Sequence, residues 1–441
     1  MKKLFYYFVF FSVVITLVNF ECKSNFTTKV TIQGSQWYLN DQIVNKGSPA
    51  EGLLMNVRMV NSVFEDRGNF LPKKILNFDP DTNTDEFISM IPEYVSSGVN
   101  AFTISLQGGA PGYEGAVNTA FNADGSLRKE YFRRIEKVIR TCDAHCAVVN
   151  LSCFYQRQHS HYSALKGKEE ITKALENVVN WITEKRFTNV LLEIANEYRH
   201  DGYKKWPDGD WLISEQGQIE LIRTAKRLNP KLLVTTGGMG HGTFPEPLPQ
   251  ETDFLVIHFN NTTLENIPSK INKLKKYGKP IICNEDDKLK IEGAIAMSLS
   301  VSNGCGWGYM NYPVNQKAPF RFMGVADDTV VYKMFKNVSS PGFQIHEMPK
   351  ASSIIITSPN DGDIFNVDEN IEVRISNLYP DKSIGYSIQL FVNKQTVIDA
   401  GSSLQVNWRS DKSGTYSLQA VVKDVSGVEL YRSAKVEIII K

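Results

Sequence analysis

The sequence has few cysteines, few histidines and almost no net charge, and each shortage argues against a class of protein. The 441 residues include six cysteines and seven histidines, and the cysteines lack the spacing of a structural zinc site. The formal net charge of +1 gives no sign of the basic surface that nucleic-acid binding requires. We therefore expect no metal, no cofactor and no nucleic-acid partner, and we expect a monomer.

Only one long apolar run is present, at the N-terminus. Lys2 and Lys3 precede the run 4–18, and polar sequence follows. This is the layout of a bacterial signal peptide, and the run is shorter than the about twenty residues that a membrane helix needs. Residues 1–24 are therefore expected to be a signal peptide or a lipoprotein signal. Lipidation of Cys22, cleavage near it and an uncleaved anchor all stay open, and each places the mature protein outside the cytoplasm, as a secreted, periplasmic or cell-surface protein.

The other cysteines are candidates for burial rather than for chemistry. Cys283 and Cys305 lie in apolar, strand-like runs, where a free cysteine behaves as a small hydrophobic residue. An oxidising compartment would permit one disulfide among Cys142, Cys146 and Cys153.

Between residues 50 and 335, short apolar runs alternate with helical patterns. Ile171, Leu175 and Val178, for example, share one face of an expected helix. Strands that alternate with helices imply a parallel sheet covered by helices, and eight such units match a closed (β/α)8 barrel. An open doubly wound sheet is the alternative, disfavoured by this count and by the lack of a glycine-rich phosphate motif after the first run. The eight runs are 53–60, 101–106, 147–154, 190–195, 232–236, 254–259, 280–284 and 306–311.

The pattern changes near residue 346. Beyond it, short β-rich runs are separated by turn signals, and residues 387–392 alternate between polar and apolar side chains. Such runs predict a small immunoglobulin-like β-sandwich, without the paired cysteines of antibody domains. Residues 30–44 predict a hairpin that caps the barrel. The expected organisation is a signal at 1–24, a barrel domain at 25–345 and a β-sandwich at 350–441.

Two of the eight apolar runs lead into an Asn-Glu pair. The fourth continues into Asn196-Glu197, and the seventh ends in Asn284-Glu285. A buried carboxylate costs free energy unless it is paired or protonated, so packing alone does not explain these residues. Because the carboxyl ends of barrel strands form the active face, we expect the two glutamates to meet there. Paired carboxylates are the equipment of glycoside hydrolysis.

Several segments resemble glycoside hydrolase clan A, and especially the family 5 cellulases. Residues 190–197 resemble the acid/base strand of the clan, and residues 279–285 resemble its nucleophile strand. Residues 257–259 resemble its sixth strand, and Trp307 matches the tryptophan of the eighth strand that stacks on a sugar ring. The resemblance extends over about residues 35–335.

This resemblance implies a (β/α)8 O-glycosyl hydrolase that retains the anomeric configuration of a carbohydrate substrate. Glu197 would be the general acid/base and Glu285 the nucleophile, with their carboxyl groups about 5–5.5 Å apart. The pKa of Glu197 is then expected to be held up in the free enzyme, so that this residue can donate a proton.

The sequence departs from the clan's pattern around the expected nucleophile. Asn260 occupies the position of a tyrosine on the sixth strand, and Asp286 follows Glu285 where an aromatic or small residue is common. The clan's arginine is missing from the second strand, although Arg58 on the first strand would supply a similar hydrogen bond. The departures leave the substrate open, and they leave a non-catalytic carbohydrate-binding barrel as the alternative function.

Further residues are candidates for binding sugar through hydroxyl contacts or through flat ring faces. These substrate-binding candidates are Asn196, His258, Trp307, Arg58, Asn260, Tyr198 and Trp206.

Structural roles compete with these functional ones. Glu197 would pair with Arg199 and Glu285 with Lys288 if both were ordinary strand-end residues, and His258 would be a core histidine. Trp307 and the tryptophans of the loop after Glu197 would then be packing residues.

Two other motifs are set aside. Residues 237–242 are rich in glycine but lack the dinucleotide-binding spacing, and we expect a loop at the rim of the cleft. His159 and His161 resemble paired metal ligands, but such ligands begin on the first strand of barrel hydrolases, and here they follow the third.

Overall fold

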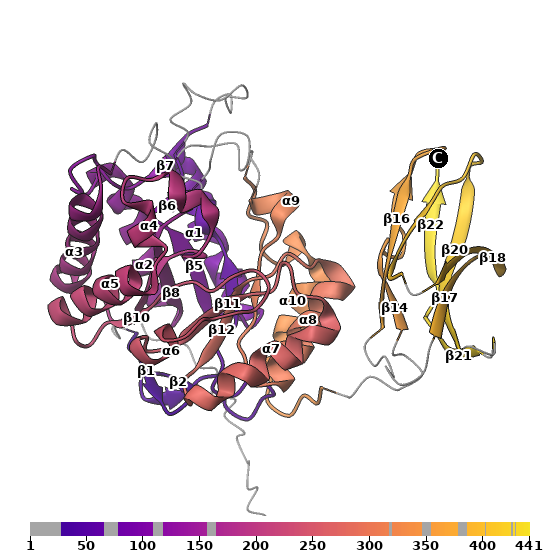
Figure 1. The fold of residues 1–441 in the computed structure, drawn as a ribbon, viewed down its shortest axis with the longest axis horizontal. Coiled ribbons are helices and arrows are strands. Elements are labelled where there is room, and N and C mark those ends of the chain that lie inside the picture. Colours follow the sequence, from indigo (N-terminus) through magenta and orange to yellow (C-terminus); the bar gives the residue numbers. More distant parts are fainter. Residues whose placement is uncertain are drawn as a thin grey trace, which may run out of the picture.

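The computed structural model describes residues 28–65, 78–108, 118–156, 165–316, 320–345, 354–377, 386–401, 403–424, 427 and 429–441. The N-terminal segment with Cys22 lies outside the described residues, as do His159 and His161. Figure 1 shows a body of strands surrounded by helices, followed by a smaller body made of strands.

Eight parallel strands form the first body, one from each apolar run. They are β4 (Asn56–Arg58), β5 (Ala101–Ser105), β8 (Val148–Phe154), β9 (Val190–Ala195), β10 (Leu233–Thr235), β11 (Leu255–His258), β12 (Ile281–Glu285) and β13 (Gly308–Tyr309). Six of them pair in the order β10-β9-β8-β5-β4-β13, and β11 pairs with β12. Parallel bridges between Gly237 and Val256 and between Ile282 and Gly306 connect the two sets. The sheet is therefore closed, which confirms the barrel and excludes the open sheet.

A helix follows each barrel strand and packs on the outside of the barrel (Figure 1). These helices are α1 (Pro80–Ser96), α2 (Lys129–Ala144), α3 (Lys168–Lys185), α5 (Glu215–Leu228), α6 (Leu248–Glu251), α7 (Ile267–Leu274), α8 (Lys290–Ser302) and α10 (Thr329–Val338). The α1 helix begins where Asp79 accepts a hydrogen bond from the backbone N–H of Thr82 at 2.7 Å, a typical N-cap. The predicted face of α3, with Ile171, Leu175 and Val178, is fully buried.

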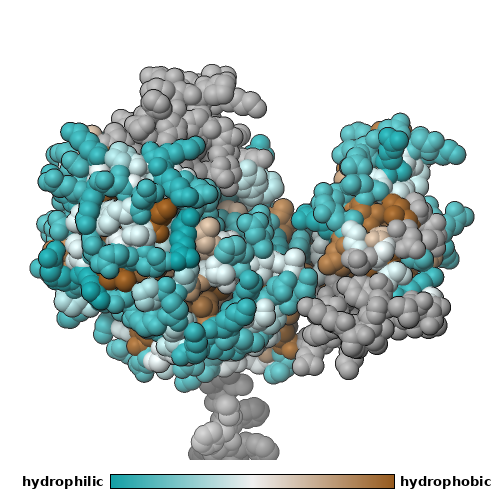
Figure 2. Space-filling model, viewed as in Figure 1, coloured by the Kyte–Doolittle hydropathy of each residue, from teal (hydrophilic) through white to brown (hydrophobic). Residues whose placement is uncertain are grey.

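Short elements occupy the loops between these units. They are the two-residue strands β6 (Gln107–Gly108) and β7 (Asn118–Thr119), the helices α4 (Gly209–Leu212) and α9 (Tyr312–Asn315), and the 3-10 turns η1 (Val60–Val63), η2 (Asp201–Lys205), η3 (Leu264–Asn266), η4 (Lys275–Tyr277) and η5 (Gly324–Asp327). The face of the barrel seen in Figure 2 is mostly hydrophilic, because the apolar side chains point inward.

A three-stranded antiparallel sheet closes the end of the barrel where the strands begin. It consists of β1 (Val30–Gln33), β2 (Gln36–Leu39) and β3 (Gln42–Ile43). Trp37 of β2 is fully buried and meets the ring of Phe254 edge-on at 5.2 Å. Around these rings cluster interior side chains such as Leu54, Val148 and Leu191. The predicted capping hairpin is confirmed, and it leaves the opposite end of the barrel for chemistry.

The strands after residue 353 form a β-sandwich with its own hydrophobic core. They are β14 (Ile354–Ser358), β15 (Ile364–Phe365), β16 (Ile371–Asn377), β17 (Tyr386–Val392), β18 (Gln395–Gly401), β19 (Gln405–Trp408), β20 (Gly414–Asp424), β21 (Glu429–Arg432) and β22 (Val436–Ile440). One sheet has the order β14-β16-β19, and the other has the order β15-β22-β20-β17-β18 with β21 beside β20. Val373, Leu390 and Ile438 belong to the shared core, which confirms the predicted all-β body after the barrel.

The cysteines differ in part from expectation. Cys283 and Cys305 are free and buried, as predicted. Cys142 and Cys153 are also free and fully buried. A disulfide among Cys142, Cys146 and Cys153, which the sequence left possible, is therefore not formed. Cys146 is disulfide-bonded.

None of the helices in the described part of the chain has both the length and the apolar character that crossing a bilayer requires.

Candidate active site

Glu197 and Glu285 lie together at the open end of the barrel, where β9 and β12 finish. Both carboxylates approach one nitrogen of His258, the last residue of β11. His258 Nδ1 is 3.4 Å from Oε1 of Glu197 and 3.6 Å from Oε2 of Glu285. These two distances to one nitrogen set an upper limit of about 7 Å on the separation of the two carboxylate oxygens. The separation of about 5–5.5 Å in a retaining pair falls below this limit.

Glu285 is held by two cationic or polar side chains from neighbouring strands. Asn260 donates a hydrogen bond from Nδ2 to Oε1 of Glu285 at 2.6 Å. Arg58 at the end of β4 places Nη1 3.2 Å from Oε2 of Glu285, and the glutamate is only 7% exposed. Asn260 thus contacts Glu285 from the position where the clan has its tyrosine, and Arg58 makes the contact that we expected of it.

Glu197 is held by a different set of donors. Gln156 donates from Nε2 to Oε2 of Glu197 at 3.1 Å, and the backbone N–H of Gly240 donates to Oε1 at 3.0 Å. The backbone of Glu197 has a φ of 45°, a left-handed conformation that residues other than glycine seldom adopt. Such a conformation costs about 1–3 kcal/mol and persists where the surroundings impose it, often at a functional site.

Asn196 lies beside this pair. Its Nδ2 donates to Oε1 of Gln156 at 3.0 Å, so Gln156 bridges Asn196 and Glu197. Its Oδ1 makes no hydrogen bond with the described residues, although Asn196 is 1% exposed. A buried polar atom without a partner suits a ligand that brings its own donor.

A second carboxylate layer lies beneath the site. Glu193, two residues before Ala195 on β9, is fully buried, as strand alternation predicts. Asn150 and Asn284 each donate to its Oε2, at 3.3 and 3.2 Å. Burial raises the pKa of Glu193. Gly237 passes so close that a Cβ there would collide with Oε1 of Glu193, which explains a glycine at this position.

The pKa values of Glu197 and His258 are shifted in opposite directions. Burial alone would raise the pKa of Glu197, but the hydrogen bond and the charge of His258 outweigh burial and lower the pKa. Burial alone would lower the pKa of His258, but the charges of Glu285, Glu197 and Glu193 outweigh it and raise that pKa. The pKa of Glu197 is therefore not held up in the unliganded protein as we expected, because the hydrogen bond and the charge of the adjacent His258 lower it.

This arrangement predicts a pH-dependent contribution of His258 to stability. Because the pKa of His258 is raised in the folded protein, the contribution is fully present below the unfolded value of 6.5 and is lost as the pH rises through the native pKa. We expect the stability difference between the parent and His258→Gln to shrink as the pH is raised from about 6.5 into the alkaline range. Urea unfolding at several pH values measures it, with the exposed His241→Gln as control. A difference that stays constant or grows over this range would contradict the prediction.

The structure corrects three of the aromatic candidates. Trp307 is fully buried, donates from Nε1 to Oδ2 of Asp286 at 2.9 Å and stacks on Tyr309 at 5.7 Å. Tyr198 is also fully buried, and Trp206 is 4% exposed and lies edge-on to Phe154. Rings that other side chains cover present no face to a sugar, so these three residues pack the barrel and its loops.

The competing pairings of the two glutamates are not found. Arg199 forms its ion pair with Glu215, not with Glu197. Lys288 forms its ion pair with Asp286 at 2.9 Å, not with Glu285.

Sequence reasoning left two contacts of Glu197 out of the candidate set. Gln156 follows the third barrel strand. Only this position, at the carboxyl end of a barrel strand, could have marked it as a site residue in the sequence. Gly240 belongs to the glycine-rich segment 237–242, which we expected at the rim of the cleft. It contributes a backbone N–H, and residue types do not reveal such a donor.

Comparison with known proteins identifies the fold. No family model and no curated protein matches the sequence. An endo-β-1,4-mannanase from Thermotoga petrophila matches with a TM-score of 0.52 and 14% identity, over 88% of this chain and 97% of that chain. A putative glycoside hydrolase from Bacteroides vulgatus matches with a TM-score of 0.49 and 12% identity, over 94% and 82%.

A Bacteroides uniformis β-glucuronidase matches 94% of this chain with a TM-score of 0.47 and 12% identity, but the chain spans only 48% of that enzyme's length. At 14% identity and a TM-score of 0.52, the match to the mannanase shows a shared fold. The chain therefore has the (β/α)8-barrel fold of this solved mannanase, followed by a β-sandwich.

Proposed function

We propose that the protein is a retaining β-glycosidase that hydrolyses O-glycosidic bonds of a polysaccharide or oligosaccharide. The observation that carries the proposal is the meeting of Glu197 and Glu285 at one ring nitrogen of His258, Nδ1, at the open end of the barrel. Two carboxylates within about 7 Å of each other, each with its own donors, suit an acid/base and a nucleophile. The shared fold with a mannanase supports the proposal.

In this mechanism Glu285 attacks the anomeric carbon and forms a covalent glycosyl-enzyme while the leaving oxygen departs. Arg58 and Asn260 contact the carboxylate of Glu285 and hold it in place for this attack. Glu197 protonates the leaving oxygen and then removes a proton from the water that hydrolyses the intermediate. The anomeric carbon is inverted twice, so its configuration is retained.

The proton for the first step would be shared by Glu197 and His258. In the unliganded site the charges of Glu285, Glu197 and Glu193 raise the pKa of His258, which favours the proton on the ring. The separation of 3.4 Å between Nδ1 and Oε1 of Glu197 is close to hydrogen-bond length, so the proton can pass to Glu197 when the substrate brings its glycosidic oxygen. Formation of the ester on Glu285 removes a negative charge and leaves Glu197 ionised as the base.

Glu197→Gln should lower the turnover of substrates with poor leaving groups by about 10²–10⁴-fold. A glycoside with an activated aryl leaving group needs no protonation, so formation of the glycosyl-enzyme from it should be nearly unaffected. Pre-steady-state kinetics on both substrate types measures the difference, with Glu130→Gln at a 71% exposed side chain as control. An equal loss on the two substrates would exclude the acid role of Glu197.

The substrate is identified by product analysis on β-glucans, mannans, xylans and algal galactans. Anomeric NMR of the first product tests retention at the same time, and an inverted first product would overturn the mechanism. A parent that binds one of these glycans without cutting it would instead be a carbohydrate-binding barrel.

We also propose that the mature protein acts outside the cytoplasm. The charged and apolar N-terminus has the layout of a signal peptide, and the disulfide at Cys146 suits an oxidising compartment. Membrane attachment through a lipid on Cys22 and the monomeric state stay predictions.

A further inference from the structure

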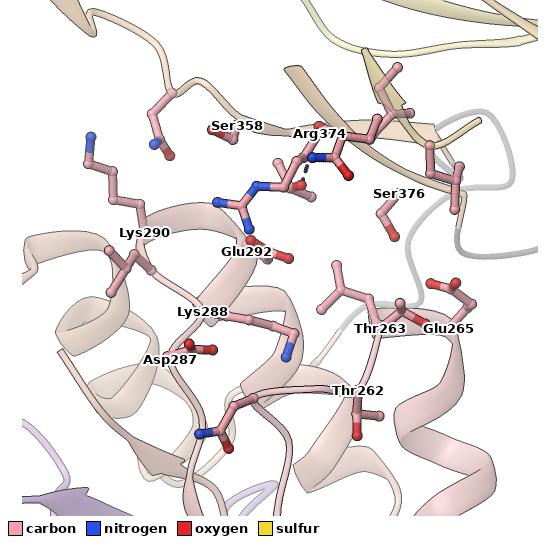
Figure 3. Close-up of a pocket in the computed structure, with 18 of the residues that line it drawn as sticks. Thr262, Thr263, Glu265, Asp287, Lys288, Lys290, Glu292, Ser358, Arg374 and Ser376 are labelled. Carbon is pink, nitrogen blue, oxygen red and sulfur yellow. Dashed lines mark hydrogen bonds between the residues drawn. The ribbon is translucent and has the colours of Figure 1, made fainter. Parts of the chain in front are cut away.

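A cavity of about 890 Å³ lies between the barrel and the β-sandwich (Figure 3). The loop after β11 lines one side of it, and the segment between β12 and α8 lines another. The β-sandwich contributes residues of β14 and β16 and of the turn before β19, including Arg374, Ser376 and Ser403. Lys290 at the start of α8 reaches Asp363 of the sandwich at 2.7 Å, so an ion pair connects the two bodies at the cavity.

The cavity adjoins the candidate active site through one residue. Asn260 lines the cavity and donates its 2.6 Å hydrogen bond to the carboxylate of Glu285. Asn260 therefore lies between Glu285 and the cavity, which places the cavity one residue away from the proposed nucleophile. An adjoining cavity is where further sugar units of a long substrate would be bound.

The lining of the cavity is polar. Among its described residues none is aromatic, and most carry hydroxyl, amide or charged groups. The hydroxyl and amide side chains are those of Asn260, Asn261, Thr262, Thr263, Thr357, Ser358, Asn360, Ser376, Ser403 and Gln405. Such groups donate and accept hydrogen bonds, as the hydroxyls of a sugar do.

The charges in the lining disfavour an anionic ligand. Four carboxylates line the cavity, those of Glu265, Asp287, Glu292 and Asp363, against three cations, Lys288, Lys290 and Arg374. Lys288 and Lys290 already pair with Asp286 and Asp363. Arg374 points across the cavity toward Glu292 of α8 (Figure 3). No surplus of positive charge is left among these residues to attract a sulfated or uronic-acid chain.

We propose that the β-sandwich and the barrel together form an additional binding region for the substrate, in which Arg374 and the surrounding hydroxyl and amide groups hold neutral sugar units beyond the bond that is cut. The proposal rests on the proposed glycosidase function for its substrate class. It gives the β-sandwich a role in recognising long substrates.

Binding to an inactive protein tests this independently of hydrolysis. In a Glu285→Gln background, isothermal titration calorimetry compares disaccharides with hexasaccharides of the β-1,4-mannan, β-1,4-glucan and β-1,4-xylan series. Arg374→Ala is expected to weaken binding of the preferred hexasaccharide by about 10-fold and to leave the disaccharide unchanged. Ser403→Trp, which adds a bulky ring at the cavity, should do the same.

The matched control is Arg409→Ala, because Arg409 is an exposed arginine of the same sandwich outside the cavity lining. Thermal unfolding of each variant verifies that the fold is kept. The inference is overturned if both cavity variants bind the hexasaccharide like the control, if short and long ligands weaken equally, or if none of the neutral series binds. Tighter binding of a sulfated galactan than of every neutral hexasaccharide would also overturn it.

Hydrolysis separates this inference from the proposed function. The comparison uses the protein with Glu285 intact. If this protein binds hexasaccharides through the cavity but cuts none of them, the glycosidase proposal fails and the cavity proposal stands. If it cuts them and the cavity variants keep the parent's preference for hexasaccharides over disaccharides in kcat/KM, the glycosidase proposal stands and the cavity proposal fails.

Discussion

Glu285→Ala is expected to lower glycan turnover by about 10⁴-fold or more, a loss typical of removing a catalytic nucleophile. The covalent route requires the carboxylate of Glu285, which Arg58 and Asn260 hold in place. Glu197, the other carboxylate that contacts His258 here, is held in its own place by Gln156 and Gly240. Initial rates on the identified substrate measure the loss, with the surface variant Glu251→Gln as control.

Added azide makes the same experiment specific for the role of Glu285. In Glu285→Ala, azide can occupy the space of the missing carboxylate and attack from that side, so the glycosyl azide should have the inverted configuration. In Glu197→Ala the glycosyl-enzyme still forms, and azide should give the retained configuration. Product NMR distinguishes the two. A retained azide from Glu285→Ala, or full activity of that variant, would contradict the assignment.

Lys288→Met is expected to destabilise the protein by about 3–5 kcal/mol, the usual effect of removing one partner of a buried ion pair. Lys288 is 7% exposed, and its Nζ donates to Asp286 at 2.9 Å and to the carbonyl of Phe259 at 2.7 Å. Methionine fills a similar volume but leaves the fully buried Asp286 with Trp307 as its main remaining side-chain donor. Urea unfolding measures the change in the free energy of unfolding.

A surface pair provides the comparison. Lys276 is 64% exposed and lies 3.3 Å from Glu246, so Lys276→Met should change stability by less than about 1 kcal/mol. Adding Asp286→Asn to Lys288→Met should recover part of the loss, because the buried charge is then gone while the amide oxygen still accepts from Trp307. A Lys288→Met variant as stable as the surface control would show that the buried pair does not stabilise the fold.

The same ion pair also affects the active site. Phe259, whose carbonyl Lys288 holds, lies between His258 and Asn260, and both neighbours contact Glu285. Asp286 was noted in the sequence only as a departure from the clan's pattern. In the structure it connects Lys288 and Trp307 behind the candidate nucleophile, a role that requires three segments distant in sequence to meet.

The repeated elements of the barrel were predictable because their signals are local. Each of the eight apolar runs contains a barrel strand, since buried parallel strands need continuous apolar sequence. Glu193 could be placed beneath the site from strand alternation alone, and Trp37 within the capping hairpin from its apolar neighbours. These inferences depend on periodicity, which a short stretch of residues carries by itself.

The sugar-binding roles predicted for the aromatic residues were wrong because the direction of these side chains is not set by local periodicity. Tyr198 and Trp206 follow a barrel strand, but the path of the loop turns both rings into the core. Trp307 precedes a strand of two residues, too short for alternation to indicate which way the ring points. The sequence shows which aromatic residues lie near the ends of barrel strands. Packing in the folded protein determines which of their rings stay exposed to a ligand.

The sequence by itself determined the barrel, the β-rich body that follows it and the two strand ends that carry Glu197 and Glu285, because hydrophobic periodicity and strand order are properties of the chain. Only the tertiary structure decided that His258 lies between the two carboxylates, that Arg58, Asn260, Gln156 and Gly240 hold them, and that a polar cavity continues toward the β-sandwich. Those contacts join residues up to hundreds of positions apart, and closure of the barrel brings them within hydrogen-bonding distance.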